Sequence, residues 1–392
     1  MSDTTLAEAA WRLGFGDLPV DEGIALREGT TWRHFPAPDP ARYAGLLSIA
    51  DLDAFLRTDA ARTPRISMAD GGRKGSAAVP PEEFIEEGGA RVDLPRLLGR
   101  FDAGATLVVS QFHELHAPLA RFCRGLEKAF LHGVQANIYL TPPGAQGFRV
   151  HFDTHDVLVM QIAGRKSWRV WDRLPFAAPT RLTPWANSHE PEGDPHDVLM
   201  APGDALYLPR GAMHDAAAQR GEASLHVTVG LLEPSMGEML RNLIDTLEAG
   251  DASFRASVPS WRLGEPDGVA AVQARLGPLL ARLGAPDVAE RLAMATLDRV
   301  AQDRLSLAGR GLMTPPPGPE ERLRLADAMH HHLVPLPEGG AALRWYGGVQ
   351  RLSADELGWL MAIEEGAAPG ALGEDALAFA RRLGALGLLE RG

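Results

Sequence analysis

The sequence predicts an α+β fold in which a sandwich or barrel of short strands is followed by helices. Between residues 105 and 232, turn residues separate short apolar runs rich in β-branched residues: TLVVS, VQANIYL, DVLVMQIAG, KSWRVW, DALYLP and ASLHVTVGL. Runs of this kind are typical of the strands of a sandwich or barrel. After Glu233 the apolar residues instead recur at three- and four-residue spacing, which indicates helices.

The composition is that of a globular cytoplasmic protein. A chain of 392 residues, 45% of them hydrophobic and 23% charged, is long enough for about two or three domains. The formal net charge is −12 and no long block of lysine or arginine occurs, so neither nucleic acid nor a membrane is an expected partner. The one cysteine, Cys123, excludes an intrachain disulfide. The opening MSDTTLAEAAWRLGF lacks the features of a signal peptide, and no apolar run approaches bilayer length.

Changes in this patterning predict four segments. Residues 1–100 mix helical and irregular stretches and are expected to pack on the barrel; within them IADLDAFL, after Ser48, is predicted to be a helix. Residues 101–233 are expected to form the barrel. Residues 234–313 are predicted to form about two or three helices. These helices carry more apolar surface than an isolated pair of helices can bury, so we expect a homodimer.

The run TPPPGP at residues 314–319 cannot continue a helix and marks a boundary. In residues 320–392 we predict a helix over EERLRLADAMHHHL, a β-ribbon around LRWYGGVQRL, a helix that begins with the capping box at Ser353, and a last helix through Leu386. Helices with a small ribbon indicate a winged-helix-like domain. Its 7 basic and 11 acidic residues favour packing against protein rather than DNA binding.

Two short motifs contain candidate metal ligands. His151 and Asp153 are two residues apart where a strand begins, so they point to the same side. Residues 203–214, GDALYLPRGAMH, match the pattern G-x5-P-x-G-x2-H, the second signature of cupin barrels, whose tight corners let His214 point inward. Two histidines and one carboxylate on one face of a metal are typical of non-haem Fe(II) oxygenases, because open positions remain for O2 and a cosubstrate. We therefore predict Fe(II) at these three residues.

Further residues are expected to line the same barrel. Asn137 and Tyr139 share one face of the strand VQANIYL. Lys166 opens the strand KSWRVW, and a lysine that points inward from an apolar strand is costly to bury without an anion. The far carboxylate of 2-oxoglutarate is such an anion.

The runs NIYLTPPGAQGFRVHFDTHDVLVMQIAGRKSWRVW and PGDALYLPRGAMHDAAAQRGEASLHVTVG resemble the JmjC-type ribosomal oxygenases, bacterial and animal hydroxylases that oxidise ribosomal proteins. The resemblance extends to RISMADGGRK and to the order of barrel, helical dimerisation domain and winged helix. It implies a double-stranded β-helix (a cupin/JmjC barrel), Fe(II) held by the three predicted ligands, and 2-oxoglutarate and O2 as cosubstrates. It also implies that Lys166 pairs with the C5 carboxylate of 2-oxoglutarate, with Asn137 and Tyr139 lining the same pocket.

One position departs from the family pattern. Gly230 stands where some members carry a hydroxyl-bearing residue near the cosubstrate. That contact is therefore either absent or made by Thr228 or Ser224.

The remaining histidines and two tryptophans are expected to be structural or exposed. We expect His226 to be a buried histidine bonded to backbone rather than a fourth ligand, and His155 to lie at the rim. We expect His113 and His116 to lie at a solvated helix start, and His189 and His196 in an acidic lid or connector over residues 184–200. We expect His330 to His332 to lie on the surface of a helix. Trp168 and Trp171 are expected in the barrel core.

The predicted activity is hydroxylation of a protein or peptide side chain, with arginine or histidine of a ribosomal protein as leading examples by resemblance. A tailoring hydroxylase of a peptide natural product is one alternative, and a non-catalytic metal-binding cupin that acts as a sensor or scaffold is another. Lys166 with Asn137 and Tyr139 favours the enzyme, because a scaffold does not need them. Demethylation of methyl-lysine ranks lower because no aromatic cage is visible in the sequence.

Overall fold

The computed structural model describes residues 4–74, 76–172, 183, 190–258, 260–302, 310–345 and 348–392, with only the backbone for residues 298–302. The chain forms two compact units, Met1–Glu233 and Pro234–Gly392. In the described part of the chain, no helix has both the length and the apolar character needed to cross a bilayer.

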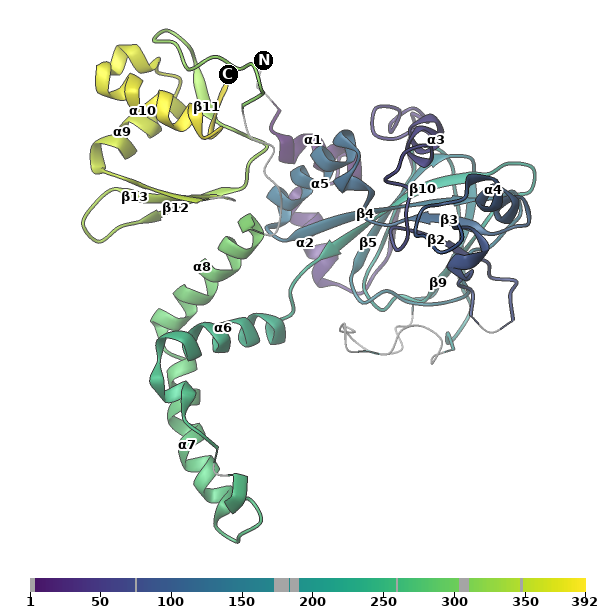
Figure 1. Ribbon diagram of the computed structural model, residues 1–392, viewed down its shortest axis with the longest axis horizontal. Coiled ribbons are helices and arrows are strands. Elements are labelled where there is room, and N and C mark those ends of the chain that lie inside the picture. Colours follow the sequence, from purple (N-terminus) through teal and green to yellow (C-terminus); the bar gives the residue numbers. More distant parts are fainter. Residues whose placement is uncertain are drawn as a thin grey trace. The chain divides into compact units, whose positions relative to one another are not determined.

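A seven-stranded antiparallel sheet is the centre of the first unit (Figure 1), with the strand order β1-β8-β5-β10-β4-β3-β2. Its strands are β1 (Arg33–Phe35), β2 (Ile66–Ala69), β3 (Thr106–Val109), β4 (Gly133–Thr141), β5 (Asp156–Ala163), β8 (Ala205–Leu208) and β10 (Ser224–Leu232). Both edge strands, β1 and β2, come from the first hundred residues. The amino-terminal segment is therefore part of the sheet as well as a cover for it.

A three-stranded sheet packs against one face of the large sheet and completes the double-stranded β-helix. Its order is β7-β6-β9, with β6 (Lys166–Val170), β7 (His196–Met200) and β9 (His214–Ala218). Alternate residues of both sheets form the core between them: Val157, Val159, Trp168, Val170, Val198, Met200, Leu206 and Leu208. The predicted cupin-type barrel is thus present.

The predicted lid or connector over residues 184–200 is wrong for its last five residues, which form β7. The reason is alternation: Val198 and Met200 are buried between the sheets while the residues beside them are exposed, and all five pair with β6. Residues 184–189, including His189, lie outside the described residues.

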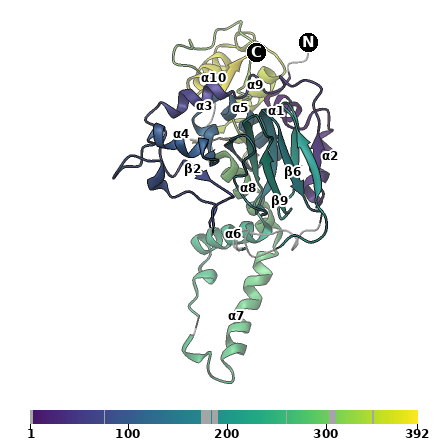
Figure 2. The same ribbon diagram turned by 90° about the vertical axis from the view of Figure 1, so that its right-hand side faces the viewer.

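Helices cover the other face of the large sheet (Figure 2): α1 (Leu6–Phe15), α2 (Val20–Glu28), α3 (Ile49–Leu56), α4 (Leu94–Asp102) and α5 (Ala117–Phe130). Their apolar residues, such as Trp11 and Phe122, pack with the strand residues Ile138 and Leu158 in one core. Because β5 is buried on both faces, its sequence is apolar almost throughout. The helix predicted after Ser48 is confirmed as α3, with its capping box.

The second unit begins with three helices, α6 (Met236–Gly250), α7 (Gly268–Leu283) and α8 (Pro286–Gln302). Leu243, Leu247 and Val288 form their small core. The carboxy-terminal part contains β11 (Leu323–Leu325), β12 (His331–Pro335), β13 (Ala341–Trp345), β14 (Gly348–Leu352), α9 (Ala354–Glu364), α10 (Glu374–Ala385) and β15 (Leu389–Arg391). β12, β13 and β14 make an antiparallel sheet, and β11 pairs with β15.

The helix predicted over EERLRLADAMHHHL is wrong, because β11 and the start of β12 occupy this segment. Leu323 and Leu325 alternate into the core, and the backbone N–H of Leu325 donates to Glu364. Helical spacing and strand alternation are hard to separate in so short an apolar run. His331 and His332 therefore lie on a strand, and His330, which precedes it, is buried. The helix with the capping box at Ser353 is confirmed, and the winged-helix-like character stays a prediction.

Candidate metal centre

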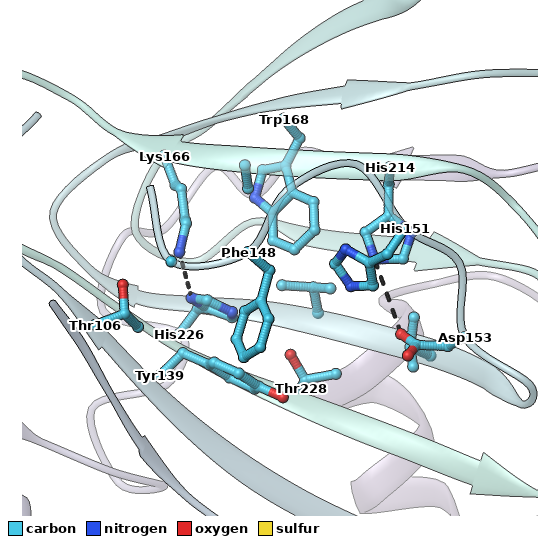
Figure 3. Close-up of a pocket in the computed structure, with 14 residues that line it drawn as sticks. Thr106, Tyr139, Phe148, His151, Asp153, Lys166, Trp168, His214, His226 and Thr228 are labelled. Atoms are coloured by element: carbon cyan, nitrogen blue, oxygen red, sulfur yellow. Dashed lines mark hydrogen bonds and ion pairs between the residues drawn. The ribbon is translucent and has the colours of Figure 1, made fainter. Parts of the chain in front are cut away.

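Three predicted ligands meet at the mouth of the barrel (Figure 3). His151 and His214 face each other across an isolated β-bridge, in which each backbone N–H donates to the other's carbonyl, at 3.0 and 2.7 Å. Asp153 follows two residues after His151, and its Oδ2 is 3.8 Å from Nε2 of His214. One ligand atom from each side chain lies within 4.8 Å of the other two. This spacing suits a single metal ion.

Hydrogen bonds orient both imidazoles. Nδ1 of His151 is 2.7 Å from the carbonyl of Arg149, and Nδ1 of His214 is 2.9 Å from the carbonyl of Ala212. Since a carbonyl can only accept, each Nδ1 donates, and Nε2 is the ring nitrogen that could bind a metal. This is the arrangement by which metal-ligating histidines are usually held.

Two glycines make the turns that bring His214 to the site. Gly203 has φ +95°, and a Cβ there would lie 2.4 Å from the carbonyl oxygen of Asp39. Gly211 has φ +87°, and its N–H donates to the carbonyl of Asp153 at 2.9 Å. A left-handed backbone favours glycine at both positions. The second turn is thus tied directly to the strand segment that carries the other two ligands.

The charges at the site match what a metal requires. Burial, reinforced by the neighbouring His151, lowers the pKa of His214 to about 4. Burial alone would raise the pKa of Asp153, but the three imidazoles of His151, His214 and His155 bring it below its usual value. A neutral imidazole at His214 and an ionised carboxylate are the states in which these groups bind metals.

A cavity of about 100 Å³ extends from the triad into the barrel. It is lined from both sheets by Thr106, Tyr139, Gly147, Phe148, His151, Asp153, Val157, Val159, Lys166, Trp168, His214, Ala216, His226 and Thr228. Figure 3 shows Lys166 at the end opposite Asp153, with Tyr139 and Thr228 along one wall and Trp168 along the other.

Lys166 is the cation at the inner end of this cavity, and its side chain is 4% exposed. Its Nζ donates to Oγ1 of Thr141 at 2.9 Å and lies 3.5 Å from Nδ1 of His226. Among the residues that the structure describes, no carboxylate forms an ion pair with it. A buried ammonium without a counter-charge is costly, which favours an anionic ligand beside it.

Burial lowers the pKa of Lys166 to about 7, whereas in an unfolded chain the pKa of lysine is about 10.4. Between these values the unfolded state binds more protons, so the free energy of unfolding of the ligand-free protein should rise with pH. Lys166→Met removes this contribution. We expect the stability of the wild type relative to this variant, measured by chemical denaturation, to increase from about pH 7 to about pH 10. A difference that is constant over this range would contradict the lowered pKa.

Tyr139 and His226 form the floor near Lys166. They are paired across β4 and β10, and their rings stack with centroids 4.9 Å apart and an interplanar angle of 5°. Burial raises the pKa of Tyr139 and lowers that of His226 well below its ordinary value, with nearby Lys166 lowering the latter further. His226 is buried as expected, but its hydrogen-bond partner is the Lys166 side chain rather than backbone.

Asn137 is placed differently from its neighbour Tyr139. It shares the strand face and pairs with Thr228 in register, but it is not among the residues that line the cavity. Its Oδ1 accepts the backbone N–H of Gln111 at 2.9 Å. Asn137 therefore bonds to the backbone of a neighbouring segment in this structure, and its place beside 2-oxoglutarate stays a prediction.

Sequence reasoning missed several lining residues, including Thr106, Phe148 and His226. Alternation could have found some of them: His226 is two residues before Thr228, and Thr141, which holds Lys166, is two residues after Tyr139. Thr106 and Phe148 lie in other segments and carried no signal in spacing.

Among the described residues, histidines other than His151, His214 and His226 do not line the cavity. The predicted solvated position of His113 is wrong, because the ring is 7% exposed and its Nδ1 accepts the backbone N–H of Ala136. His196, which was expected in the lid or connector, lies on β7 and pairs with Asp172 at an exposed site. His155 packs on Gly230, where a Cβ would lie 2.7 Å from its Nε2. The ring thus fills the space that a side chain at position 230 would need.

Comparison with known proteins agrees with this geometry. Residues 108–239 match the JmjC domain family model. The chain is 34% identical to ribosomal oxygenase 1 of Gallus gallus over 239 residues, 58% of this chain and 38% of that protein. It is 37% identical to the bifunctional lysine-specific demethylase and histidyl-hydroxylase NO66 of Dictyostelium discoideum over 151 residues, 36% of this chain and 28% of that protein. The chain thus spans well under half the length of these curated relatives.

Solved structures of similar fold cover nearly the whole chain. The X-ray structure of Escherichia coli YcfD has a TM-score of 0.55 and 17% identity, over 96% of this chain and 98% of that one. A structure of YcfD described as a ribosomal oxygenase in complex with cobalt and 2-oxoglutarate has a TM-score of 0.52 and 16% identity, over 96% and 98%. Together with the barrel described above, these likenesses show a JmjC/cupin fold.

Proposed function

We propose that this chain is an Fe(II)- and 2-oxoglutarate-dependent oxygenase that hydroxylates a protein or peptide side chain. The observation that carries the proposal is one cavity with a His-Asp-His triad at its mouth and, at its inner end, an ammonium that pairs with no carboxylate of the described residues. The JmjC domain match and the similarity to ribosomal oxygenases support the same chemistry.

The residues present fit a ferrous ion. His151, Asp153 and His214 would hold it through two Nε2 atoms and one carboxylate oxygen. Such a donor set leaves coordination positions open on one side. The hydrogen bonds to Nδ1 of both histidines fix the rings in the tautomer that a metal needs.

The inner end of the cavity fits the far carboxylate of 2-oxoglutarate. Lys166 would pair with it, already aligned by Thr141 and His226, and Tyr139 and Thr228 would offer hydroxyl groups along the same wall. A ferrous ion with 2-oxoglutarate and O2 supplies the oxidant that converts a substrate C–H to C–OH, while 2-oxoglutarate leaves as succinate and CO2. The apolar lining, including Val157, Val159 and Trp168, would limit the access of water to the site.

Turnover tests this activity directly. With Fe(II) and 2-oxoglutarate the purified protein should release succinate, and a protein substrate should increase the rate. Absence of iron binding by the wild-type protein would contradict the proposal.

The melting temperature distinguishes the enzyme from a metal-binding scaffold. If 2-oxoglutarate binds the folded enzyme in the presence of Mn(II), it must raise the melting temperature. For a scaffold that does not bind 2-oxoglutarate, the melting temperature would not change.

The substrate proposed is a histidine or arginine side chain of a ribosomal protein. The names of the relatives, ribosomal oxygenase and histidyl-hydroxylase, support this choice. In a strain that lacks this protein, one ribosomal protein should be lighter by the mass of one oxygen atom. If no ribosomal protein changes mass, a peptide natural product becomes the better candidate, and loss of a methyl group from a methylated peptide would indicate demethylation.

We also propose that the second unit forms a homodimer. Met236, Leu240 and Ile244 lie four residues apart on α6 and are 65%, 39% and 40% exposed. A continuous apolar stripe on a helix is typical of an interface. Leu240→Glu should convert the dimer to a monomer in light scattering, whereas Thr246→Glu, on another side of α6, should not. A monomeric wild type would contradict the proposal.

Nucleic acid is not proposed as a partner. In residues 320–392, where charge is net acidic, several described arginines are neutralised by ion pairs: Arg324 with Glu390, Arg351 with Glu338, Arg382 with Glu356 and Arg391 with Glu321. Arginines paired in this way are poorly placed to contact phosphates. The single cysteine fits the proposed cytoplasmic location.

A further inference from the structure

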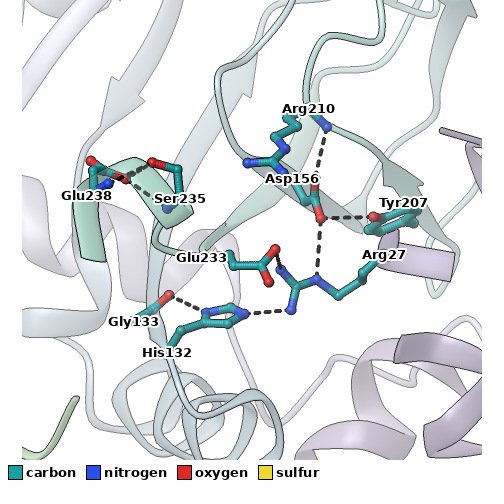
Figure 4. A network of polar contacts seen from close by, with 9 residues as sticks. All are labelled: Arg27, His132, Gly133, Asp156, Tyr207, Arg210, Glu233, Ser235 and Glu238. Carbon is teal, nitrogen blue, oxygen red and sulfur yellow. Dashed lines mark hydrogen bonds and ion pairs between the residues drawn. The ribbon is translucent and has the colours of Figure 1, made fainter. Parts of the chain in front are cut away.

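A buried carboxylate lies behind the metal centre, outside the cavity. Asp156 opens β5, and its side chain is 6% exposed (Figure 4). One oxygen, Oδ1, accepts the backbone N–H of Arg210 at 2.9 Å. The other, Oδ2, accepts the hydroxyl of Tyr207 at 2.9 Å and Nε of Arg27 at 3.3 Å. One carboxylate thus binds a strand residue and a turn residue that both precede His214.

The turn held by Asp156 is the one that delivers His214. Pro209 has no N–H, so Arg210 offers the first backbone donor of the turn. The next residue, Gly211, donates to the carbonyl of Asp153, and β9 begins at His214 three residues later. The turn is therefore attached to the segment of Asp153 and Asp156 at two successive N–H groups. The first of these attachments is a side-chain hydrogen bond, which mutation can remove.

Arg27, in the last turn of α2, supplies the counter-charge for Asp156, and its side chain is 8% exposed. One of its terminal nitrogens donates to Nε2 of His132 at 2.6 Å, and the other to Glu233 at 3.2 Å. Burial, reinforced by the charge of Arg27, lowers the pKa of His132 to about 4. This ring is therefore neutral and can accept from Arg27, while its Nδ1 donates to the carbonyl of Gly133. Contacts with two further groups, His132 and Glu233, thus fix the guanidinium beside Asp156.

We infer that Asp156 is a positioning residue of the metal centre: its carboxylate, held by Arg27 and Tyr207, fixes the backbone at Arg210 and so the position from which His214 enters the site. The inference rests on the proposed metal site. Loss of a hydrogen bond that orients a metal ligand typically costs about 10- to 100-fold in metal affinity. Asp156 acts on a ligand through the backbone, and the effect expected here is about 10-fold.

Two double variants separate the hydrogen bond from the buried charge. Arg27→Met/Asp156→Asn removes both charges but keeps a carbonyl oxygen that can accept from Arg210. Arg27→Met/Asp156→Leu removes the charges and the acceptor while keeping a similar shape. Titration with Co(II), followed by its visible absorption, should give about 10-fold weaker binding and a changed spectrum for the leucine variant relative to the asparagine variant. Equal affinities and spectra would overturn the inference.

A matched control removes the explanation by general destabilisation. Glu127 and Arg124 form another buried ion pair in the first unit, 2% and 5% exposed, and Glu127 also accepts a backbone N–H, that of Val134. Glu127→Gln should lower the melting temperature and leave Co(II) affinity within about 2-fold of wild type, since β4, the strand that contains Val134, carries no metal ligand. A loss of affinity as large as that of the leucine variant would show that stability alone explains the effect.

Tyr207→Phe keeps the inference testable if the leucine variant does not fold. It removes one of the hydrogen bonds to Asp156 and leaves both charges and the bond to Arg210, so Co(II) affinity should fall less than in the leucine variant, by about 3-fold. Unchanged affinity in this variant would then overturn the inference. If the wild-type protein binds no Co(II), the proposed function itself fails. This outcome differs from failure of the inference, in which the wild-type protein binds Co(II) and the variants bind it equally well.

Discussion

His214→Ala is expected to abolish turnover and to weaken metal binding more than any other single replacement. The variant loses one of three ligands, whereas the backbone hydrogen bonds between positions 151 and 214 are kept, so the effect is that of the missing imidazole. Loss of a hydrogen bond to a ligand already costs about 10- to 100-fold in metal affinity, so loss of the ligand itself should exceed about 100-fold. Co(II) titration and succinate release measure the two effects.

His196→Ala is the matched control for this variant. It also replaces a histidine of the small sheet, but His196 is exposed, pairs with Asp172 and does not line the cavity. Metal affinity and succinate release should remain at the wild-type level. Turnover by His214→Ala at the wild-type rate would mean that the metal, if any, is bound elsewhere.

Lys166→Met is expected to weaken 2-oxoglutarate binding by about 10- to 100-fold, because hydrogen bonds to charged groups contribute about 1.5–3 kcal/mol. The ion bound by the triad does not contact this side chain, so Co(II) affinity should be unchanged. Succinate release at saturating 2-oxoglutarate should recover in part, which separates this variant from His214→Ala. The ligand-free variant should also be at least as stable as the wild type, because it removes a buried ammonium that pairs with no carboxylate in the described part of the chain.

Arg165→Met is the control for the change of charge. Arg165 precedes Lys166 but is 55% exposed and pairs with Glu222 at the surface. Its replacement should leave the dissociation constant for 2-oxoglutarate unchanged. If Lys166→Met binds 2-oxoglutarate as tightly as the wild type, the cavity has a different ligand.

The metal triad could be predicted because its geometry is local. The spacing of two residues between His151 and Asp153 predicts that their side chains point to the same side. The turn before His214 has a defined length and places His214 opposite His151. Lys166 could be predicted because a charged residue at an inward position of an apolar strand stands out. The roles of these residues stay predictions, but their convergence needed no knowledge of the rest of the chain.

Contacts between distant segments could not be predicted in the same way. Alternation placed Asn137 and Tyr139 on one face, but it could not show that Tyr139 lines the cavity while Asn137 accepts the backbone N–H of Gln111. The Asp156 network joins α2, β5, β8 and the end of β10, which no spacing in the sequence connects. His226 was expected to bond to backbone because nothing in the sequence showed that Lys166 lies beside it.

The errors in secondary structure also have a common physical cause. HDVLM in β7 and LRL in β11 are short strands whose pairing partners, β6 and β15, decide their conformation. In short segments tertiary pairing outweighs local preference, and turn-like or helix-like neighbours hide the alternation. Longer strands such as β5 and β10 were predicted because burial on both faces leaves them few polar residues.

The packing of His155 on Gly230 links two positions that are 75 residues apart in the numbering and share one volume. In an evolving lineage neither position is free to vary alone: a side chain can be gained at 230 only after, or together with, a smaller residue at 155. Proteins of this fold should therefore carry bulk at one of the two positions and little at the other. The choice between them decides whether an imidazole from the segment before β5 or a side chain from β10 occupies this space near Asp153.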